Sequence, residues 1–179
     1  MKRRLAMILC ICMIGALMLA GCGDSGSGKS PNQTNNGGAG SENKGGKGYS
    51  FKAKGTEIFV DMDMSSIEEK LGEPVSYFEE PSCAAQGTAR LFTYSGFEID
   101  TYPDGEKDLV GYIILKDDTV ATPEGVDLSK TKADVIKAYG ENYKENGKAL
   151  VYEKDGMKLS FIMDGDNISS IQYSSSVMD

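Results

Sequence analysis

The chain has 179 residues, of which 40% are hydrophobic and 26% are charged, so it is long enough and apolar enough for one globular domain with additional segments. Its formal net charge of −8 would repel nucleic-acid phosphates, so we expect no nucleic-acid partner. The sequence contains no histidine, which excludes Ser–His and Cys–His catalysis and disfavours zinc sites. We therefore expect no metal site and no cofactor.

Residues 1–21 have the pattern of a bacterial lipoprotein signal peptide. Basic residues at Lys2–Arg4 precede an uncharged apolar run, Leu5–Ala20, which is shorter than the roughly 20 apolar residues of a membrane-spanning helix. The following Leu19–Cys22 resembles the lipobox, in which a cysteine thiol receives diacylglycerol and a peptidase cuts before that cysteine. We expect Cys22 to carry a lipid that contains palmitate, and this lipid to anchor the chain on the extracytoplasmic face of the cell membrane. A plain secretory signal or an uncleaved anchor helix remain alternatives.

The segment after the cleavage site predicts a flexible tether. Loss of the leader lowers the number of basic residues from 19 to 16 against 27 acidic ones, so the mature chain carries a net charge of −11. Surface charge then gives no attraction to anionic lipids, and the anchor must be the lipid itself. Residues 22–48 are rich in Gly, Ser and Asn and cannot bury enough apolar surface to fold, so the predicted domain spans residues 49–179. Cys83 then lacks a partner within the chain, and either a buried thiol or an intermolecular disulfide is consistent with this.

Two helices and six strands are predicted in the folded part. The first helix begins at Ser65 or Ser66 and ends at Gly72, and the second begins near Thr131 and ends at Gly140. Alternating apolar residues separated by Ser-Gly and Asp-Gly turns indicate antiparallel hairpins. The predicted strands are residues 89–94, 97–102 and 110–115 after the first helix, and 149–153, 157–163 and 168–173 after the second.

The two halves of this pattern align as a degenerate tandem repeat. The helix end at Gly72 matches Gly140, and the matched positions in the strands are Tyr94 with Tyr152, Phe97 with Met157, Ile99 with Leu159, Asp104 with Asp164 and Ile113 with Ile171. The predicted fold class is therefore α+β, with two tandem units that each combine a helix with a three-stranded antiparallel meander and share one sheet. The units span about residues 58–118 and 123–176.

This pattern resembles the small surface lipoproteins of Firmicutes that carry β-lactamase-inhibitor-protein-like repeats, most of which have no assigned activity. The resemblance covers roughly Ile58–Tyr173 and rests on the helix–Gly endings and four short motifs. Proteins of that fold include a secreted inhibitor that grips an enzyme across its sheet and a small lipoprotein of outer-membrane assembly, so the resemblance implies binding. The four motifs are Pro81–Ala84, Tyr94–Ile99, Thr101–Pro103 and Asp117–Gly125.

No catalytic or metal-binding constellation is found in the sequence. Asp164–Asn167 begins like a calcium loop, but Ile168 and Ser175 occupy positions where the EF-hand needs oxygen ligands. Glu98 and Asp100 are the only carboxylates spaced along one predicted strand face, and solvated positions on the outside of a sheet explain them best.

The outer face of the sheet is the predicted binding site. If Phe97 and Ile99 face the helices, strand alternation directs the side chains between them to the opposite face. We therefore expect a non-catalytic module that binds a protein or an envelope component, with an envelope-active hydrolase using acidic residues, or a structural envelope scaffold, as alternatives. The predicted binding residues are Glu98, Asp100, Tyr102, Tyr112 and Ile114.

Overall fold

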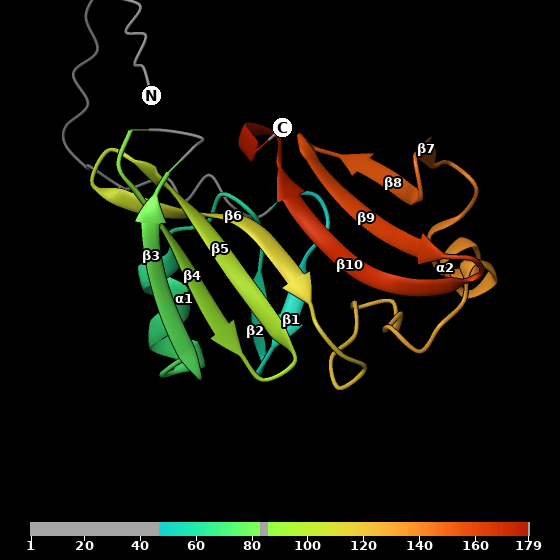
Figure 1. The fold of residues 1–179 in the computed structure, drawn as a ribbon, viewed down its shortest axis with the longest axis horizontal. Coiled ribbons are helices and arrows are strands. Elements are labelled where there is room, and N and C mark those ends of the chain that lie inside the picture. Colours follow the sequence, from blue (N-terminus) through green and yellow to red (C-terminus); the bar gives the residue numbers. More distant parts are fainter. Residues whose placement is uncertain (1–46, 83–85, 179) are drawn as a thin grey trace, which may run out of the picture. The chain divides into compact units, whose positions relative to one another are not determined.

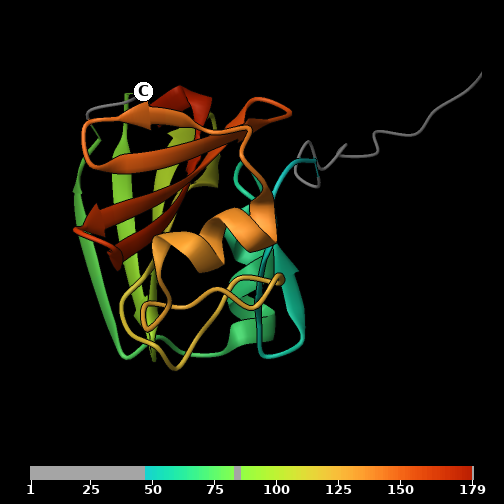
Figure 2. The ribbon, with the colours of Figure 1, turned by 90° about the vertical axis from the view of Figure 1, so that its right-hand side faces the viewer.

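The structure is a computed structural model that describes residues 47–82 and 86–178, all of which belong to one unit of the chain. Cys22 and Cys83, and with them the predicted lipid attachment and the unpaired thiol, lie outside the described residues. The described part consists of one large antiparallel sheet with two helices and a small hairpin packed on one of its faces (Figures 1 and 2). This face is called the inner face, and the opposite one the outer face.

Eight strands form the main sheet in the order β3–β4–β5–β6–β10–β9–β8–β7 (Figure 1). All neighbouring strands pair antiparallel. The hairpin of β1 (Phe51–Ala53) and β2 (Thr56–Ile58) precedes helix α1 (Met64–Leu71), and helix α2 (Lys132–Tyr139) follows β6. The strands of the sheet are β3 (Ser76–Pro81), β4 (Thr88–Tyr94), β5 (Phe97–Asp104), β6 (Lys107–Leu115), β7 (Lys144–Asn146), β8 (Ala149–Lys154), β9 (Met157–Asp164) and β10 (Asn167–Ser175).

The α+β class and the tandem arrangement are confirmed. Each helix precedes its own meander, β3–β6 after α1 and β7–β10 after α2, and the pairing of β6 with β10 joins the two meanders into one sheet. Each meander contains the three predicted strands and one strand more, β3 or β7, at the outer edge of the sheet. Every residue of these two additional strands is exposed, so neither carries the alternation of apolar residues that revealed the other six.

Both helices begin and end with capping residues. The predicted Ser65 or Ser66 cap is wrong, because the carboxylate of Asp63 accepts the Ser65 N–H at 3.1 Å and caps α1 instead. Thr131 caps α2 as predicted and forms a capping box with Asp134. The helices end at Gly72 and Gly140, which have φ values of 71° and 83°, a conformation that glycine adopts without steric cost.

A single hydrophobic core lies between the inner face and the elements that cover it. Alternation along the strands directs Ile99, Ile113 and Leu159 inward, and each of them is fully buried. The helices contribute Ile67 and Val135 to the same cluster. Among the described residues, the core cluster extends from Phe51 to Tyr173 and so includes residues of both meanders.

Candidate binding surface

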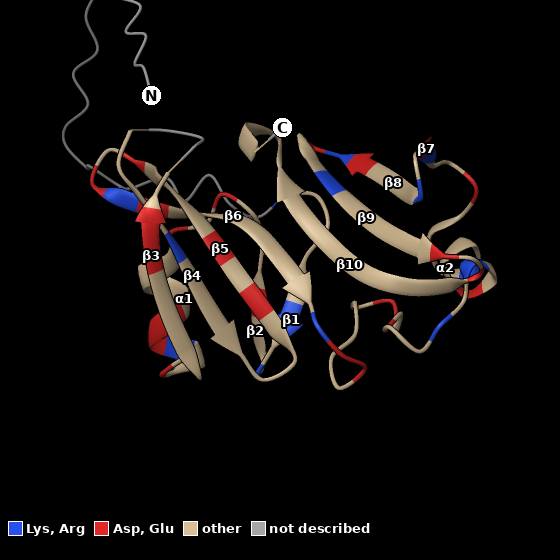
Figure 3. Cartoon of the chain, viewed as in Figure 1, with Lys and Arg blue, Asp and Glu red and all other residues tan. Residues whose placement is uncertain are grey.

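Three of the five predicted binding residues lie on the outer face and are partly exposed. Glu98 and Asp100 alternate with the buried Phe97 and Ile99 along β5, and Ile114 is the neighbour of Glu98 on β6. Glu98 Oε2 forms an ion pair with Lys116 Nζ at 3.0 Å, so the negative charge of Glu98 is already partly balanced. The acidic residues of β5 are coloured red along this strand in Figure 3.

The expectation that Tyr102 is accessible is wrong. Its side chain is only 6% exposed, and its hydroxyl donates to Asp61 Oδ1 at 2.8 Å. Burial and this hydrogen bond raise the pKa of Tyr102 above its usual value. Asp61 belongs to the segment before α1, whose backbone bonds to Val110 of β6, and no local sequence pattern reveals that this segment covers the tyrosine.

Tyr112 is half-buried under the end of the chain. Its hydroxyl donates to the carbonyl oxygen of Met178 at 2.9 Å, in the short helical turn Ser176–Met178. A Cβ atom at the neighbouring Gly111 would lie 2.9 Å from the sulfur of Met178, so the Met178 side chain packs over this glycine. The two predicted tyrosines therefore serve contacts within the chain.

The large exposed apolar side chains lie instead at the edge of the sheet formed by β3. Val75 is 77% exposed, Tyr77 48% and Phe78 59%, and the other large apolar residue exposed among the described ones is Val177. We call Val75, Tyr77, Phe78, Glu79 and Glu80 the aromatic edge. Sequence reasoning missed it because this segment is too polar and irregular to read as a half-buried strand. An exposed aromatic pair in a strand is nevertheless a signal that could have identified it.

The two edges of the sheet are equivalent in the repeat but differ in chemistry. The edge strand β7 has three residues, Lys144, Glu145 and Asn146, and so is short, charged and polar. The edge strand β3 is twice as long and carries exposed aromatic residues, with Pro81 only at its end. Natural edge strands are commonly shortened or charged to prevent pairing with other chains. The β7 edge is both short and charged, whereas β3 is longer and its first three residues, Ser76, Tyr77 and Phe78, are uncharged.

The backbone register shows which groups of β3 pair with β4 and which point away from it. The Ser82 N–H donates to the Gly87 carbonyl at 2.9 Å, in the same register that pairs Glu80 with Ala89. Hydrogen-bonded positions alternate along an antiparallel ladder, so Phe78 and Glu80 bond to β4. The N–H and C=O groups of Tyr77 and Glu79 therefore point away from the sheet.

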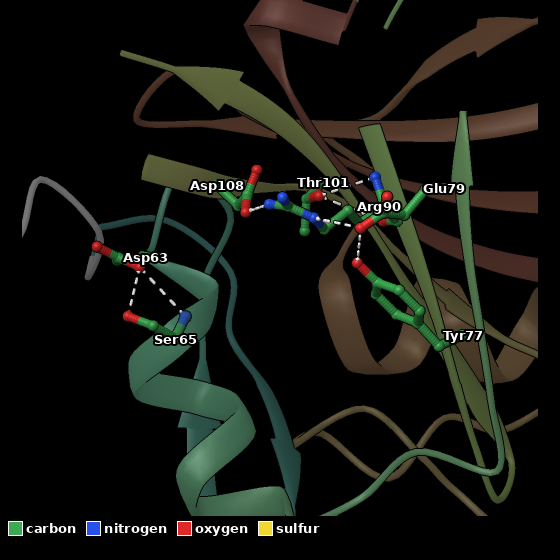
Figure 4. A network of polar contacts seen from close by, with 7 residues as sticks. All are labelled: Asp63, Ser65, Tyr77, Glu79, Arg90, Thr101 and Asp108. Atoms are coloured by element: carbon green, nitrogen blue, oxygen red, sulfur yellow. Dashed lines mark hydrogen bonds and ion pairs between the residues drawn. The ribbon is translucent and has the colours of Figure 1, made fainter. Parts of the chain in front are cut away.

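On the inner side of the edge, a polar network holds the aromatic ring of Tyr77 in place (Figure 4). The Tyr77 hydroxyl donates to Glu79, and Arg90 Nε donates to the same carboxylate oxygen at 3.2 Å. These two hydrogen bonds hold the pKa of the Glu79 carboxyl below its usual value. Arg90 also pairs with Asp108 across the sheet, so its charge is shared between two carboxylates.

A pocket of about 520 Å³ opens beside this network, between the start of α1 and the inner side of β3 and β4. Tyr77, Phe92 and Pro74 form an apolar wall, and the ring centroids of Tyr77 and Phe92 lie 5.1 Å apart in an edge-on arrangement. Four carboxylates and two cations also line it, so the pocket is acidic on balance. These charged residues are Asp63, Glu68, Glu106, Asp108, Arg90 and Lys107.

On the outer side of the edge, an acidic pair lies beside Phe78. Phe78, Leu91 and Asp100 are neighbours in one row across β3, β4 and β5. Burial and the charge of Glu80 raise the pKa of Asp100 above its usual value. Both sides of the aromatic edge thus combine apolar surface with negative charge.

Two further searches of the described residues were negative. No group of three or more acidic or cysteine side chains within residues 47–82 and 86–178 is arranged to hold a metal ion. Within the same ranges, neither helix has the length and apolar character needed to cross a membrane.

No protein-family model and no curated protein matches the sequence. Among solved structures, the chain is similar to an extracellular protein containing an SCP domain from Bacillus anthracis str. Ames, with a TM-score of 0.48 and 15% sequence identity. The similarity covers 66% of this chain and 44% of that protein, so the chain spans less than half of its length. Membership of the lipoproteins with β-lactamase-inhibitor-protein-like repeats stays a prediction.

Proposed function

We propose that this chain is a lipid-anchored, non-catalytic module on the extracytoplasmic face of the membrane, and that it binds a protein of the cell envelope through its aromatic edge. The observation that carries the proposal is the contrast between the two equivalent edges of the sheet. The β7 edge is short and charged, whereas β3 presents Tyr77 and Phe78 beside backbone groups that point away from the sheet. Exposed aromatic residues beside polar groups are typical of protein interfaces.

The pocket beside Arg90 favours binding over hydrolysis. Asp108 is paired with Arg90, and Asp63 caps α1, so two of its four carboxylates already have structural partners. The other two, Glu68 and Glu106, are exposed to solvent. A hydrolytic site excludes bulk water from its reacting groups, and the exposed Glu68 and Glu106 do not provide such an environment.

The anchor supports binding in a second way. A diacyl group on Cys22 would confine the domain to the membrane surface, and the predicted tether of residues 22–48 would let it search the space nearby. Tethering raises the effective concentration of the domain toward partners in the same layer. A module of modest intrinsic affinity would therefore be sufficient.

The test is affinity capture with the mature chain, residues 22–179, made soluble by Cys22→Ser. The chain is immobilised, exposed to envelope extract of the producing cells and crosslinked, and captured proteins are identified by mass spectrometry. We expect a defined protein to be captured by this chain and by its Val177→Ser variant, and to be lost with Phe78→Ser. Capture of nothing, or of the same proteins by the Phe78→Ser variant, would contradict the proposal.

A further inference from the structure

We propose that the aromatic edge receives an extended, cationic segment of the partner protein as an added strand of the sheet. This inference rests on the proposed function and specifies how the partner is held. Backbone groups of β3 would bind the segment, and the charges on both sides of the edge would select its side chains. This division of roles is common where a peptide extends an existing sheet.

The backbone of β3 is prepared for such pairing. Its register with β4 is regular from Ser76 to Pro81, so no bulge interrupts the edge over this stretch. Tyr77 and Glu79 direct N–H and C=O groups outward, and Pro81, which has no N–H, marks the end of the available edge. An added strand would pair with Tyr77 and Glu79, the two outward-facing positions of this stretch.

The charges of the edge select a cationic segment. On the outer face, the residue of the added strand opposite Glu80 would be its direct cross-strand neighbour, and a positive charge there would pair with the Glu80 carboxylate. On the inner face, a long basic side chain beside Tyr77 could reach the acidic pocket, where the exposed Glu68 and Glu106 take part in no ion pair within the described ranges. The ring of Tyr77 would offer its face to such a cation.

A second copy of this chain fits the edge poorly. Two β3 strands pairing antiparallel would bring the acidic residues of both copies, Glu79 and Glu80, into one short ladder. Each copy also carries a net charge of −8 before processing, so the copies repel one another at long range. Charge complementarity therefore favours a basic partner over self-association.

The probe is a synthetic octapeptide of alternating lysine and valine with blocked ends, titrated into the mature chain carrying Cys22→Ser. Binding is measured by calorimetry, and backbone amide exchange is followed residue by residue by NMR. The matching glutamate–valine peptide is the charge control. Glu79→Pro removes an N–H that points away from β4, Glu79→Ala separates the effect of the side chain, and Val177→Ser controls for exposed apolar surface.

We expect the lysine peptide to bind and to slow amide exchange at Tyr77 and Glu79, whereas the glutamate peptide does not bind. Glu79→Pro should weaken binding by about tenfold or more relative to Glu79→Ala, because one cross-strand hydrogen bond is lost. Circular dichroism of each variant verifies the fold. A lysine peptide that fails to bind, or that protects amides elsewhere, would overturn the inference, as would a dimer that Phe78→Ser disrupts. If the affinity capture succeeds while the peptide fails, the proposed function stands and only this mode of binding is lost.

Discussion

Ile114 lies directly opposite Gln172 in the ladder that joins β6 to β10. The two residues are 58 positions apart in the sequence. Ile113 and Ile171, which occupy equivalent positions in the two repeat units, have the same separation. Each unit therefore meets its own counterpart at this junction, and the two meanders are related by an approximate two-fold axis through the Ile114–Gln172 pair. Because one core crosses the junction, we expect the two units to unfold as one cooperative structure.

Replacement of either equivalent isoleucine should destabilise the whole domain. Ile113 and Ile171 are both fully buried, so Ile113→Ala and Ile171→Ala should each lower the free energy of unfolding by about 2–5 kcal/mol through lost burial and cavity formation. Chemical denaturation followed by circular dichroism and by tyrosine fluorescence should give one coincident transition for each variant. Two separate transitions would show that the units fold independently.

The equivalent tyrosines Tyr94 and Tyr152 should respond differently to removal of the hydroxyl. Tyr152 Oη donates to the carbonyl of Gly140 at 2.8 Å, beyond the end of α2, whereas the buried hydroxyl of Tyr94 has no hydrogen-bond partner among the described residues. Burial raises the pKa of Tyr152 to about 12, so its hydroxyl remains a donor at neutral pH. Tyr152→Phe should cost about 0.5–1.5 kcal/mol in thermal or denaturant unfolding.

Tyr94→Phe is the matched control for that loss, because both rings are almost fully buried. It should leave the stability unchanged or raise it slightly, since no hydrogen bond is broken. A larger loss for Tyr94→Phe than for Tyr152→Phe would be inconsistent with the hydrogen-bond pattern.

Asp100→Asn should stabilise the protein at neutral pH and leave its stability unchanged in acid. Burial and the charge of Glu80 raise the pKa of Asp100 in the folded state, so the folded protein holds this proton to higher pH than the unfolded chain does. The charged Asp100 therefore destabilises the folded protein. This loss of stability is absent below the unfolded pKa of about 3.9 and grows as the pH rises through the folded pKa. Thermal melts of wild type and variant at pH 7 and pH 3 measure the difference. An equal effect at both pH values would exclude the electrostatic explanation.

Cys22→Ser should abolish incorporation of lipid into the chain. The prediction follows from Leu19–Cys22 and the basic and apolar segments before it. Metabolic labelling with palmitate should mark the wild-type chain and leave Cys22→Ser unlabelled, while Cys83→Ser retains the label. Labelling of Cys22→Ser would show that the lipid is attached elsewhere.

Strand alternation was enough to predict six strands of the main sheet, because Phe97, Ile99 and their counterparts differ sharply in polarity from their neighbours. The β1–β2 hairpin and the edge strands β3 and β7 were not predicted. Alternation also placed Glu98, Asp100 and Ile114 on the outer face. Alternation predicts the face of the sheet on which each side chain lies, but it does not show which other segments cover that face. Tyr102 is covered because the segment around Asp61, some forty residues away in sequence, bonds to the end of β6. No local pattern records such a contact.

The aromatic edge was missed for the opposite reason. All residues of β3 are exposed, so burial leaves no periodic signal in its sequence, and only pairing with β4 defines it as a strand. The same is true of β7, which pairs with β8 over three residues. Edge strands of this kind depend on tertiary context more than on intrinsic propensity.

The most direct test of the account is site-specific photocrosslinking in the producing cells. A photoreactive phenylalanine analogue is placed at Phe78 on the β3 edge and, in a separate variant, at Glu145 on the equivalent β7 edge. We predict that the probe at position 78 forms an adduct with one defined envelope protein and that the probe at position 145 forms none. Equal adducts from both edges, or none from position 78, would contradict the claim that the aromatic edge is the binding surface.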